Sequence, residues 1–157
     1  MKKKTWKTYA FWIILAEAVG ALSGWLTRDG MKVYTEAVVQ PPLSPPPWLF
    51  PIVWSILFAL MGIGAARVSL APRSKTRSLG LNLFVIQLIV NFFWSPIFFN
   101  AQAFGTALLW LILLWILVLA MILVFRKVDK IAGYIHIPYL LWLTFAAYLN
   151  WGVWQLN

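Results

Sequence analysis

Apolar residues form five long stretches along this chain, and shorter segments that hold most of the charged residues separate them. A helix needs about 20 consecutive, mostly apolar residues to cross the hydrocarbon core of a bilayer. The stretches have about that length and cover residues 9–26, 48–68, 79–99, 103–125 and 131–154. The pattern therefore predicts an all-α integral membrane protein, a five-transmembrane-helix bundle that forms a single domain over residues 1–157.

Lysine and arginine residues lie mostly on one side of this predicted topology. Of the 13 in the chain, only Arg28 and Lys32 lie in the long first connection, residues 27–47, and the other eleven lie on the opposite side. Loops rich in lysine and arginine remain in the cytoplasm. We therefore expect the N-terminus inside and the C-terminus outside, in a bacterial cytoplasmic membrane. The N-terminal "MKKK" and the apolar residues after it are similar to a secretory signal, but that stretch is longer than a signal's apolar region, so we expect it to remain as a span.

The composition excludes several classes of protein. With 62% hydrophobic and only 11% charged residues, the chain cannot cover a water-soluble globule. The net charge of +9 comes from short clusters beside apolar stretches, which favours topology signals over a nucleic-acid surface. Cysteine is absent, His136 is the only histidine and the four carboxylates are scattered, so we expect no metal site and no paired acid and base.

Prolines dominate residues 41–47, "PPLSPPP". Proline fixes φ and has no N–H, so this segment favours extended polyproline geometry. It either forms a stiff strap over the outer mouth of the bundle or serves only as a rigid linker.

Polar residues inside the apolar stretches are the informative ones, because a bilayer does not require them. Gln87, Asn91 and Ser95 recur every four residues and therefore share one helix face with Trp94 and Phe98. Such a face either lines a ligand site or only joins helices by hydrogen bonds. Pro96, which follows directly, is expected to kink this helix.

Further inward-facing candidates lie on the other stretches. Trp54 and Trp142 are far from the span ends where tryptophan anchors a helix at the lipid interface. Glu17, near the middle of the first span, is expected to face inward because a carboxylate is costly in lipid. The fourth stretch is apolar all round and is expected to be the most lipid-exposed. A lining of aromatic, amide and hydroxyl groups suits a flat, largely apolar ligand with a few polar edges.

Three blocks of sequence resemble one known family. They are "QPPLSPPPWLFPIVWSILFALMGIG" from Gln40, "QLIVNFFWSPIFF" from Gln87 and "PYLLWLTFAAYLN" from Pro138. Each combines proline, tryptophan and asparagine at fixed offsets, and their order on five spans resembles the TspO/MBR family of translocator proteins and tryptophan-rich sensory proteins along nearly the whole chain.

The resemblance implies a bundle that is commonly a homodimer and has no cofactor, with a pocket for protoporphyrin IX, haem-type tetrapyrroles and, in some members, sterols or synthetic aromatic ligands. The matching pocket positions are Tyr34, Pro41, Pro45, Pro46, Trp54, Phe58, Asn91, Trp94, Phe98, Trp142 and Phe145. Leu43 stands where relatives usually have an aromatic residue, and no lysine or arginine follows Tyr148 as the proposed cholesterol motif requires, which argues against cholesterol.

Four functions remain open from the sequence. The first is a tetrapyrrole-binding protein that acts in homeostasis or stress sensing, and the second is an enzyme that degrades protoporphyrin in light with Trp54 and Trp142 as the reactive groups. The third is a transporter of the ligand, and the fourth is a structural subunit without a ligand. Paired broken helices around a site at the membrane midplane, as in many transporters, are not evident in the sequence.

Overall fold

The computed structural model describes residues 2–157, with side chains from Thr5 onward. Within that part of the chain every regular element is a helix, which confirms the all-α class. The elements are α1 (Lys2–Leu26), α2 (Arg28–Ala37), α3 (Leu49–Ser69), α4 (Lys75–Ser95), a π-helix η1 (Pro96–Asn100), α5 (Phe104–Val128), α6 (Lys130–Tyr134) and α7 (Ile137–Leu156).

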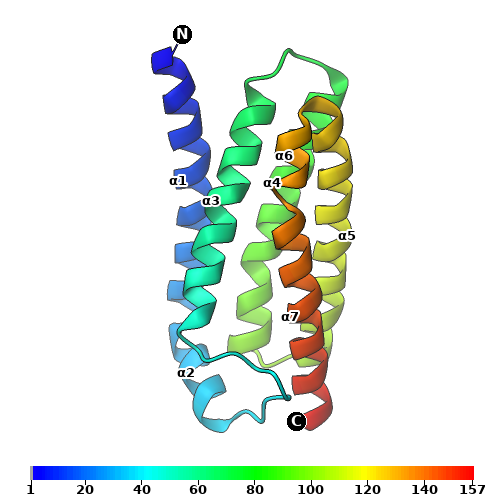
Figure 1. Ribbon diagram of the computed structural model, residues 1–157. Coiled ribbons are helices and arrows are strands. Elements are labelled where there is room, and N and C mark those ends of the chain that lie inside the picture. Colours follow the sequence, from blue (N-terminus) through cyan, green and yellow to red (C-terminus); the bar gives the residue numbers. More distant parts are fainter. Residues whose placement is uncertain (1) are drawn as a thin grey trace.

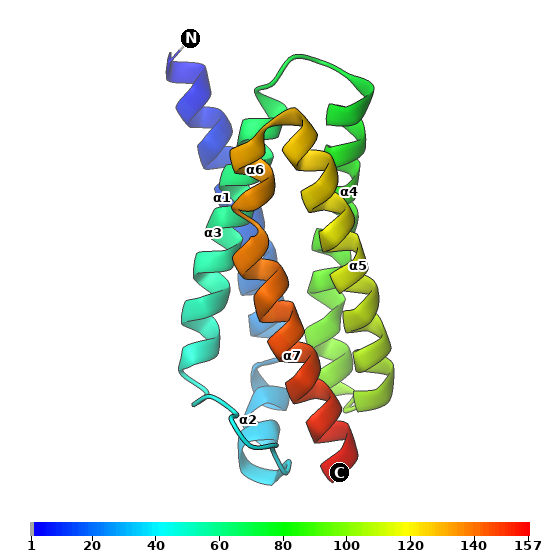
Figure 2. The same ribbon diagram turned by 45° about the vertical axis from the view of Figure 1, so that its right-hand side comes forward.

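In the part of the chain that the structure describes, five segments are long and apolar enough to cross a membrane: Thr5–Leu26, Leu49–Ser69, Lys75–Asn100, Phe104–Val128 and Lys130–Leu156. They run side by side as a bundle, and the two ends of the chain lie at opposite ends of it (Figure 1). The α3–α4 connection and the α5–α6 turn lie at the end where α1 begins, whereas α2 and the C-terminus lie at the other end (Figures 1 and 2). The predicted spans are therefore confirmed to within a few residues.

The first span is the least buried of the five. This contradicts the expectation that the fourth span would be the most exposed to lipid. Of the most apolar 18 residues of each span, only 11% are buried in Thr5–Leu26, against 33% in Phe104–Val128. Helix α5 packs against α4, α6 and α7 and buries Leu111, Leu114 and Val118 among others. The expectation was wrong because lipid and a protein interior are both apolar, so an all-apolar sequence does not distinguish them.

Pro96 interrupts the fourth element, as expected from its missing N–H. Helix α4 ends at Ser95, and the chain continues as a single π-helical turn, in which Ala101 N donates to Pro96 O at 3.0 Å. This turn buries the side chains of Phe98 and Phe99. The local change of helix type thus places two consecutive aromatic side chains in the interior.

The first connection, residues 27–47, was expected to have no helix, but it contains one. Helix α2 occupies ten of its residues and lies against η1, with Tyr34 buried at 6% exposure and its ring 5.4 Å from that of Phe98. The proline-rich part is also not continuously extended, because Leu43 adopts a positive φ of 69° and turns the chain. The segment is too polar to be a span, but Met31, Tyr34 and Val38 recur at helical spacing and pack with Phe98 and Phe99 of η1, a signal that could have indicated α2.

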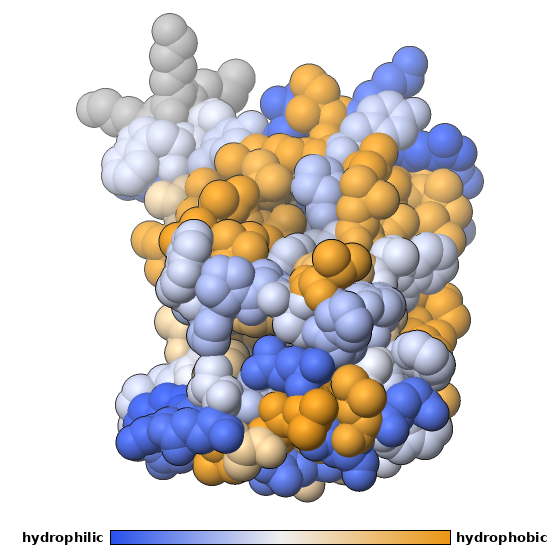
Figure 3. All heavy atoms as spheres, turned by 60° about the horizontal axis from the view of Figure 1, so that its bottom comes forward, coloured by the Kyte–Doolittle hydropathy of each residue, from blue (hydrophilic) through white to orange (hydrophobic). Residues whose placement is uncertain are grey.

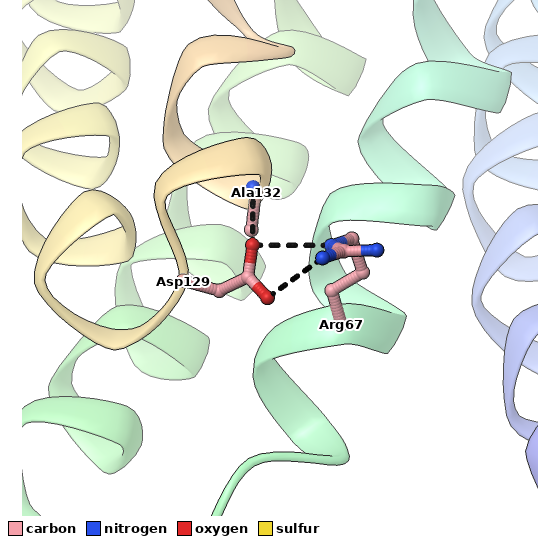
Figure 4. Close-up of polar contacts among 3 residues, drawn as sticks. All are labelled: Arg67, Asp129 and Ala132. Carbon is pink, nitrogen blue, oxygen red and sulfur yellow. Dashed lines mark hydrogen bonds and ion pairs between the residues drawn. The ribbon is translucent and has the colours of Figure 1, made fainter.

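An ion pair holds α3 to the α5–α6 turn at the end where α1 begins (Figure 4). Arg67 donates from Nε and Nη2 to the carboxylate of Asp129, at 3.1 and 3.0 Å. Asp129 Oδ1 also accepts from Ala132 N at 2.9 Å and so caps α6. Burial opposes ionisation of Asp129, but the hydrogen bonds from Arg67 and Ala132 and the charge of Arg67 outweigh it, so the pKa of this carboxyl lies below its usual value.

Candidate ligand-binding cavity

A cavity of about 300 Å³ lies inside the bundle, in the half that contains α2. Helices α1 to α5, η1 and α7 all contribute to its lining. The volume is at the lower end of the range of about 300–1,000 Å³ typical of small-molecule sites.

Tryptophan and phenylalanine side chains of α3 and α7 form one wall of the cavity. The rings of Trp54 and Trp142 meet edge to face, with centroids 6.5 Å apart and planes at 89°. Trp54 also lies 5.6 Å from Phe58, one turn further along α3. The Nε1 atom of Trp142 is buried and has no hydrogen-bond partner among the described residues. Trp54, Phe58 and Trp142 were predicted from the sequence to lie in one pocket, and all three line this cavity.

A second aromatic wall comes from α4, η1 and α2. Trp94 stacks on Phe98 with centroids 4.9 Å apart and an angle of 23° between the rings. Trp94 Nε1 donates to Asn150 Oδ1 at 3.1 Å, and Asn150 Nδ2 donates to Phe104 O at 2.8 Å, so α4, α7 and the start of α5 are tied together. Tyr34 completes this wall, and burial raises the pKa of its hydroxyl to about 12, so it stays protonated.

Asn91 belongs to the cavity lining and also to a buried hydrogen-bond network. Its Nδ2 donates to the hydroxyl of Tyr139 at 2.6 Å, and that hydroxyl donates to Gln87 Oε1 at 2.8 Å. Gln87 and Tyr139 are almost fully buried and do not line the cavity. The polar face of α4 therefore has two roles, since Gln87 joins helices whereas Asn91 at 8% exposure also reaches the cavity.

Glu17 of α1 is the single charged residue among those that line the cavity. It faces inward, as expected. The lining otherwise offers aromatic rings, aliphatic side chains, two asparagine amides and a few hydroxyl groups, and it has no lysine, arginine or histidine.

The cavity reaches the surface of the bundle between α1 and α3. Ala21 and Gly24 of α1, and Pro51 and Ser55 of α3, both line the cavity and are exposed. A Cβ atom added at Gly24 would meet no heavy atom within 4 Å. Deeper in the bundle the same two helices are in close contact, because Gly62 lies against the backbone of Ile13 and Gly20 against the ring of Phe58.

Next to the cavity, the end of the bundle that contains α2 is more hydrophilic than the flank of the bundle (Figure 3). Figure 3 shows hydrophilic side chains gathered on this face, with hydrophobic ones on the flank behind it. Arg28 lies here with its guanidinium 4.5 Å from the centre of the Trp25 ring.

The structure brings most of the predicted site residues together, and places four of them elsewhere. Tyr34, Trp54, Phe58, Asn91, Trp94, Phe98 and Trp142 all line the cavity. Phe145 stacks beside Trp142 and Tyr148, outside the lining, with centroids 5.6 and 6.3 Å away. Pro41 packs against Gly152 of α7, and Pro45 and Pro46 lie further along the same connection without lining the cavity. The role of all eleven residues in binding stays a prediction.

Several lining residues were not predicted. Leu111 and Leu114 come from the stretch expected to face lipid, and nothing in their sequence context marks them as internal. Ser23 and Thr27 are buried and line the cavity as well. They continue the polar positions of α1 beyond Glu17, a signal that could have indicated them.

Comparison with known proteins agrees with this arrangement. The sequence signature of the TspO/MBR family matches residues 12–155. The chain belongs to the TspO/MBR family. It is 40% identical to Tryptophan-rich protein TspO of Chlorobaculum tepidum over 151 residues, which cover 96% of each chain. It is 39% identical to Protein CrtK of Rhodobacter capsulatus over 150 residues, 95% of this chain and 92% of the relative.

Members of the family in animals are more distant. The identity to Translocator protein of Homo sapiens is 33% over 147 residues, which cover 91% of this chain and 86% of the human one. Family membership and the five apolar helices together make this an integral membrane protein.

Proposed function

We propose that this protein binds porphyrin-type tetrapyrroles, such as protoporphyrin IX or haem, in the cavity, and acts in tetrapyrrole homeostasis or stress sensing. The observation that carries the proposal is the pair of aromatic walls, Trp54 and Trp142 on one side and Trp94 and Phe98 on the other, on one cavity of about 300 Å³. Flat π systems pack favourably on such rings. The names of two relatives, Translocator protein of Homo sapiens and Tryptophan-rich sensory protein of Cereibacter sphaeroides, agree with a ligand-related role.

The lateral opening between α1 and α3 supports the same proposal. A tetrapyrrole is larger than a typical drug-sized ligand, so part of it would extend from the cavity through this opening. Because the opening lies on an apolar flank, an apolar ligand could enter from the bilayer without crossing water. We further propose that the N-terminus lies in the cytoplasm of a bacterial cell and that the protein forms a homodimer.

Titration in the dark tests binding. Protoporphyrin IX is added to the purified protein in detergent, and quenching of tryptophan fluorescence gives the dissociation constant. The variant Gly24→Leu places a side chain at the opening, where an added Cβ meets no heavy atom within 4 Å, and should weaken binding at least tenfold. The matched control is Ala18→Leu, at an exposed position of α1 outside the lining. Equal affinity of wild type and both variants would remove the cavity as the binding site.

Light-dependent breakdown of the bound porphyrin is a second candidate function. The observation that favours it is the contact between the indoles of Trp54 and Trp142 at the cavity wall, since an electron-rich indole can give an electron to an excited porphyrin. The variants Trp54→Phe and Trp142→Phe test it, because they remove the indoles and should abolish most of the light-dependent loss of porphyrin absorbance.

A further inference from the structure

Glu17 lies on the face of α1 that packs against α3. Ile13, Glu17, Gly20 and Gly24 recur at intervals of four, three and four residues, which places them on one side of a helix. Two members of this row contact α3 directly: the backbone of Ile13 lies against Gly62, and Gly20 lies against the ring of Phe58. Glu17 is one turn from each contact, and its side chain is partly exposed at the edge where α1 and α3 meet. Of the α1 residues that line the cavity it is the farthest from α2, which is the inner end of the cavity.

The surroundings of Glu17 contain no positive charge. The cavity lining has no lysine, arginine or histidine, and Glu17 makes no hydrogen bond or ion pair with the residues whose side chains the structure describes. By contrast, Asp129 between α5 and α6 has both an arginine and a helix N–H as partners. Glu17 is thus an acidic group at the inner end of a neutral, aromatic cavity.

A carboxyl group in this position discriminates between ligands by charge. An ionised carboxylate in low dielectric attracts a cation strongly and repels an anion equally strongly. A protonated carboxyl would still cost free energy if it were buried against a ligand that offered it no hydrogen-bond partner. In either state, the inner end favours a ligand group that is cationic or carries an N–H donor, and it disfavours a carboxylate.

We propose that Glu17 makes the inner end of the cavity selective for a cationic or N–H donor group on the buried part of the ligand. This inference rests on the proposed function only in taking the cavity as the ligand site. It also sets an orientation, because the carboxylates of a porphyrin would point away from Glu17, toward the α2 end. Arg28 and Lys32, both in α2, are the cations of the first connection.

Two flat tricyclic probes of opposite charge test the inference. They are 9-aminoacridine, a cation at neutral pH, and anthracene-9-carboxylate, an anion. Each is titrated against the purified protein in nanodiscs of phosphatidylcholine, and the ratio of the two affinities is the measured quantity. Each probe partitions into the same lipid in every sample, so a change in this ratio between variants reports the substituted side chain.

The wild type should bind the cation at least tenfold more tightly than the anion, a difference of about 1.4 kcal/mol. Glu17→Gln keeps the shape and removes the charge, and should lower the ratio at least tenfold. Glu17→Asp should keep most of the preference. Glu36→Gln removes one exposed carboxylate of α2 outside the cavity and should leave the ratio unchanged. A ratio for Glu17→Gln within twofold of wild type would overturn the inference.

Protoporphyrin titrations of the same preparations separate this inference from the proposed function. Porphyrin binding without a charge preference that depends on Glu17 would overturn the inference and leave the proposed function intact. A charge preference that depends on Glu17, in a protein that does not bind porphyrin, would support the inference and overturn the proposed function.

Discussion

The hydroxyl of Tyr139 on α7 accepts a hydrogen bond from the Asn91 amide on α4, with 2.6 Å between Nδ2 and the phenol oxygen. The same hydroxyl donates to Gln87 Oε1 at 2.8 Å. The Tyr139 hydroxyl thus connects Asn91 in the cavity wall to Gln87 in the interior. Substitution of Asn91 and substitution of Tyr139 should therefore separate effects on binding from effects on folding.

Asn91→Leu should weaken protoporphyrin binding, whereas Tyr139→Phe should act mainly on stability. In Asn91→Leu, a polar edge of the ligand loses its partner, a loss of about 1–3 kcal/mol, while the Tyr139 hydroxyl keeps its bond to Gln87. Tyr139→Phe instead removes the hydroxyl that Gln87 Oε1 accepts from and that Asn91 Nδ2 donates to, in a buried place. Fluorescence titration and thermal unfolding in detergent measure the two effects. Unchanged porphyrin affinity in folded Asn91→Leu would show that Asn91 only joins helices.

The proline-rich part of the first connection is fastened to α7. Tyr148 donates from its hydroxyl to Pro42 O at 2.8 Å, and Asn157 Nδ2 donates to Val39 O at 2.8 Å. If this segment retains the ligand, Tyr148→Phe should speed protoporphyrin dissociation by up to about tenfold, since such a bond contributes about 0.5–1.5 kcal/mol. Stopped-flow dilution measures the rate. Tyr134→Phe, at an exposed tyrosine near the other end, is the control, and equal rates in all three proteins would leave the segment as a linker.

The orientation in the membrane follows from the charges at the two ends of the bundle. Arg73, Lys75 and Arg126 belong to the positively charged end, so the α3–α4 connection should lie in the cytoplasm and Asn157 outside. Alkaline phosphatase fused after Arg73 should be inactive and the same enzyme fused after Asn157 active. The same signal at both positions would contradict the five-span topology, and the reverse pattern would contradict the orientation.

The pairing of Arg67 with Asp129 should make stability depend on pH in the acid range. The pKa of Asp129 is lower in the folded state than its unfolded value of about 3.9, so its contribution is fully present above that value. It is lost as the pH falls through the lower folded-state pKa. Asp129→Asn can still cap α6 but loses the charge. Thermal unfolding in detergent at pH 7 and pH 3 should therefore show a smaller difference for the variant than for wild type, and equal differences would argue against this contribution.

Most of the fold could be predicted from the sequence, because the length of an apolar stretch is a local property. The predicted span 48–68 differs by one residue at each end from Leu49–Ser69. Helix α2 could not be predicted in this way, since ten residues become a stable helix here by docking Tyr34 on η1. The internal position of Leu114 depends on which helices are neighbours, and an apolar stretch alone does not carry that information.

The aromatic part of the cavity was the predictable part of the site. Helical spacing placed Asn91 and Trp94 on one face, and the family resemblance added Trp54; all three line the cavity. The network that holds Asn91 could not be predicted, because Tyr139 lies 48 positions away on another helix and the sequence does not show which helices are neighbours. The prolines matched the family by sequence, but the structure places Pro41 against Gly152 rather than at the cavity.

Trp54 and Trp142 provide the prediction that separates a binder from an enzyme. The ring centroids of these two residues lie 6.5 Å apart in the cavity wall. Light excites the bound porphyrin, which can then take one electron from either indole. Dioxygen is the oxidant that the breakdown of the ring requires. Phenylalanine keeps most of the apolar bulk and removes the indole. Trp54→Phe and Trp142→Phe should therefore bind protoporphyrin within about tenfold of wild type, or about 1.4 kcal/mol, yet lose most light-dependent loss of porphyrin absorbance. Trp154→Phe, at an exposed position outside this cavity, is the control and should degrade like wild type. If wild type, all three variants and porphyrin alone in detergent bleach equally, the indoles are only cavity walls and the enzymatic candidate is wrong.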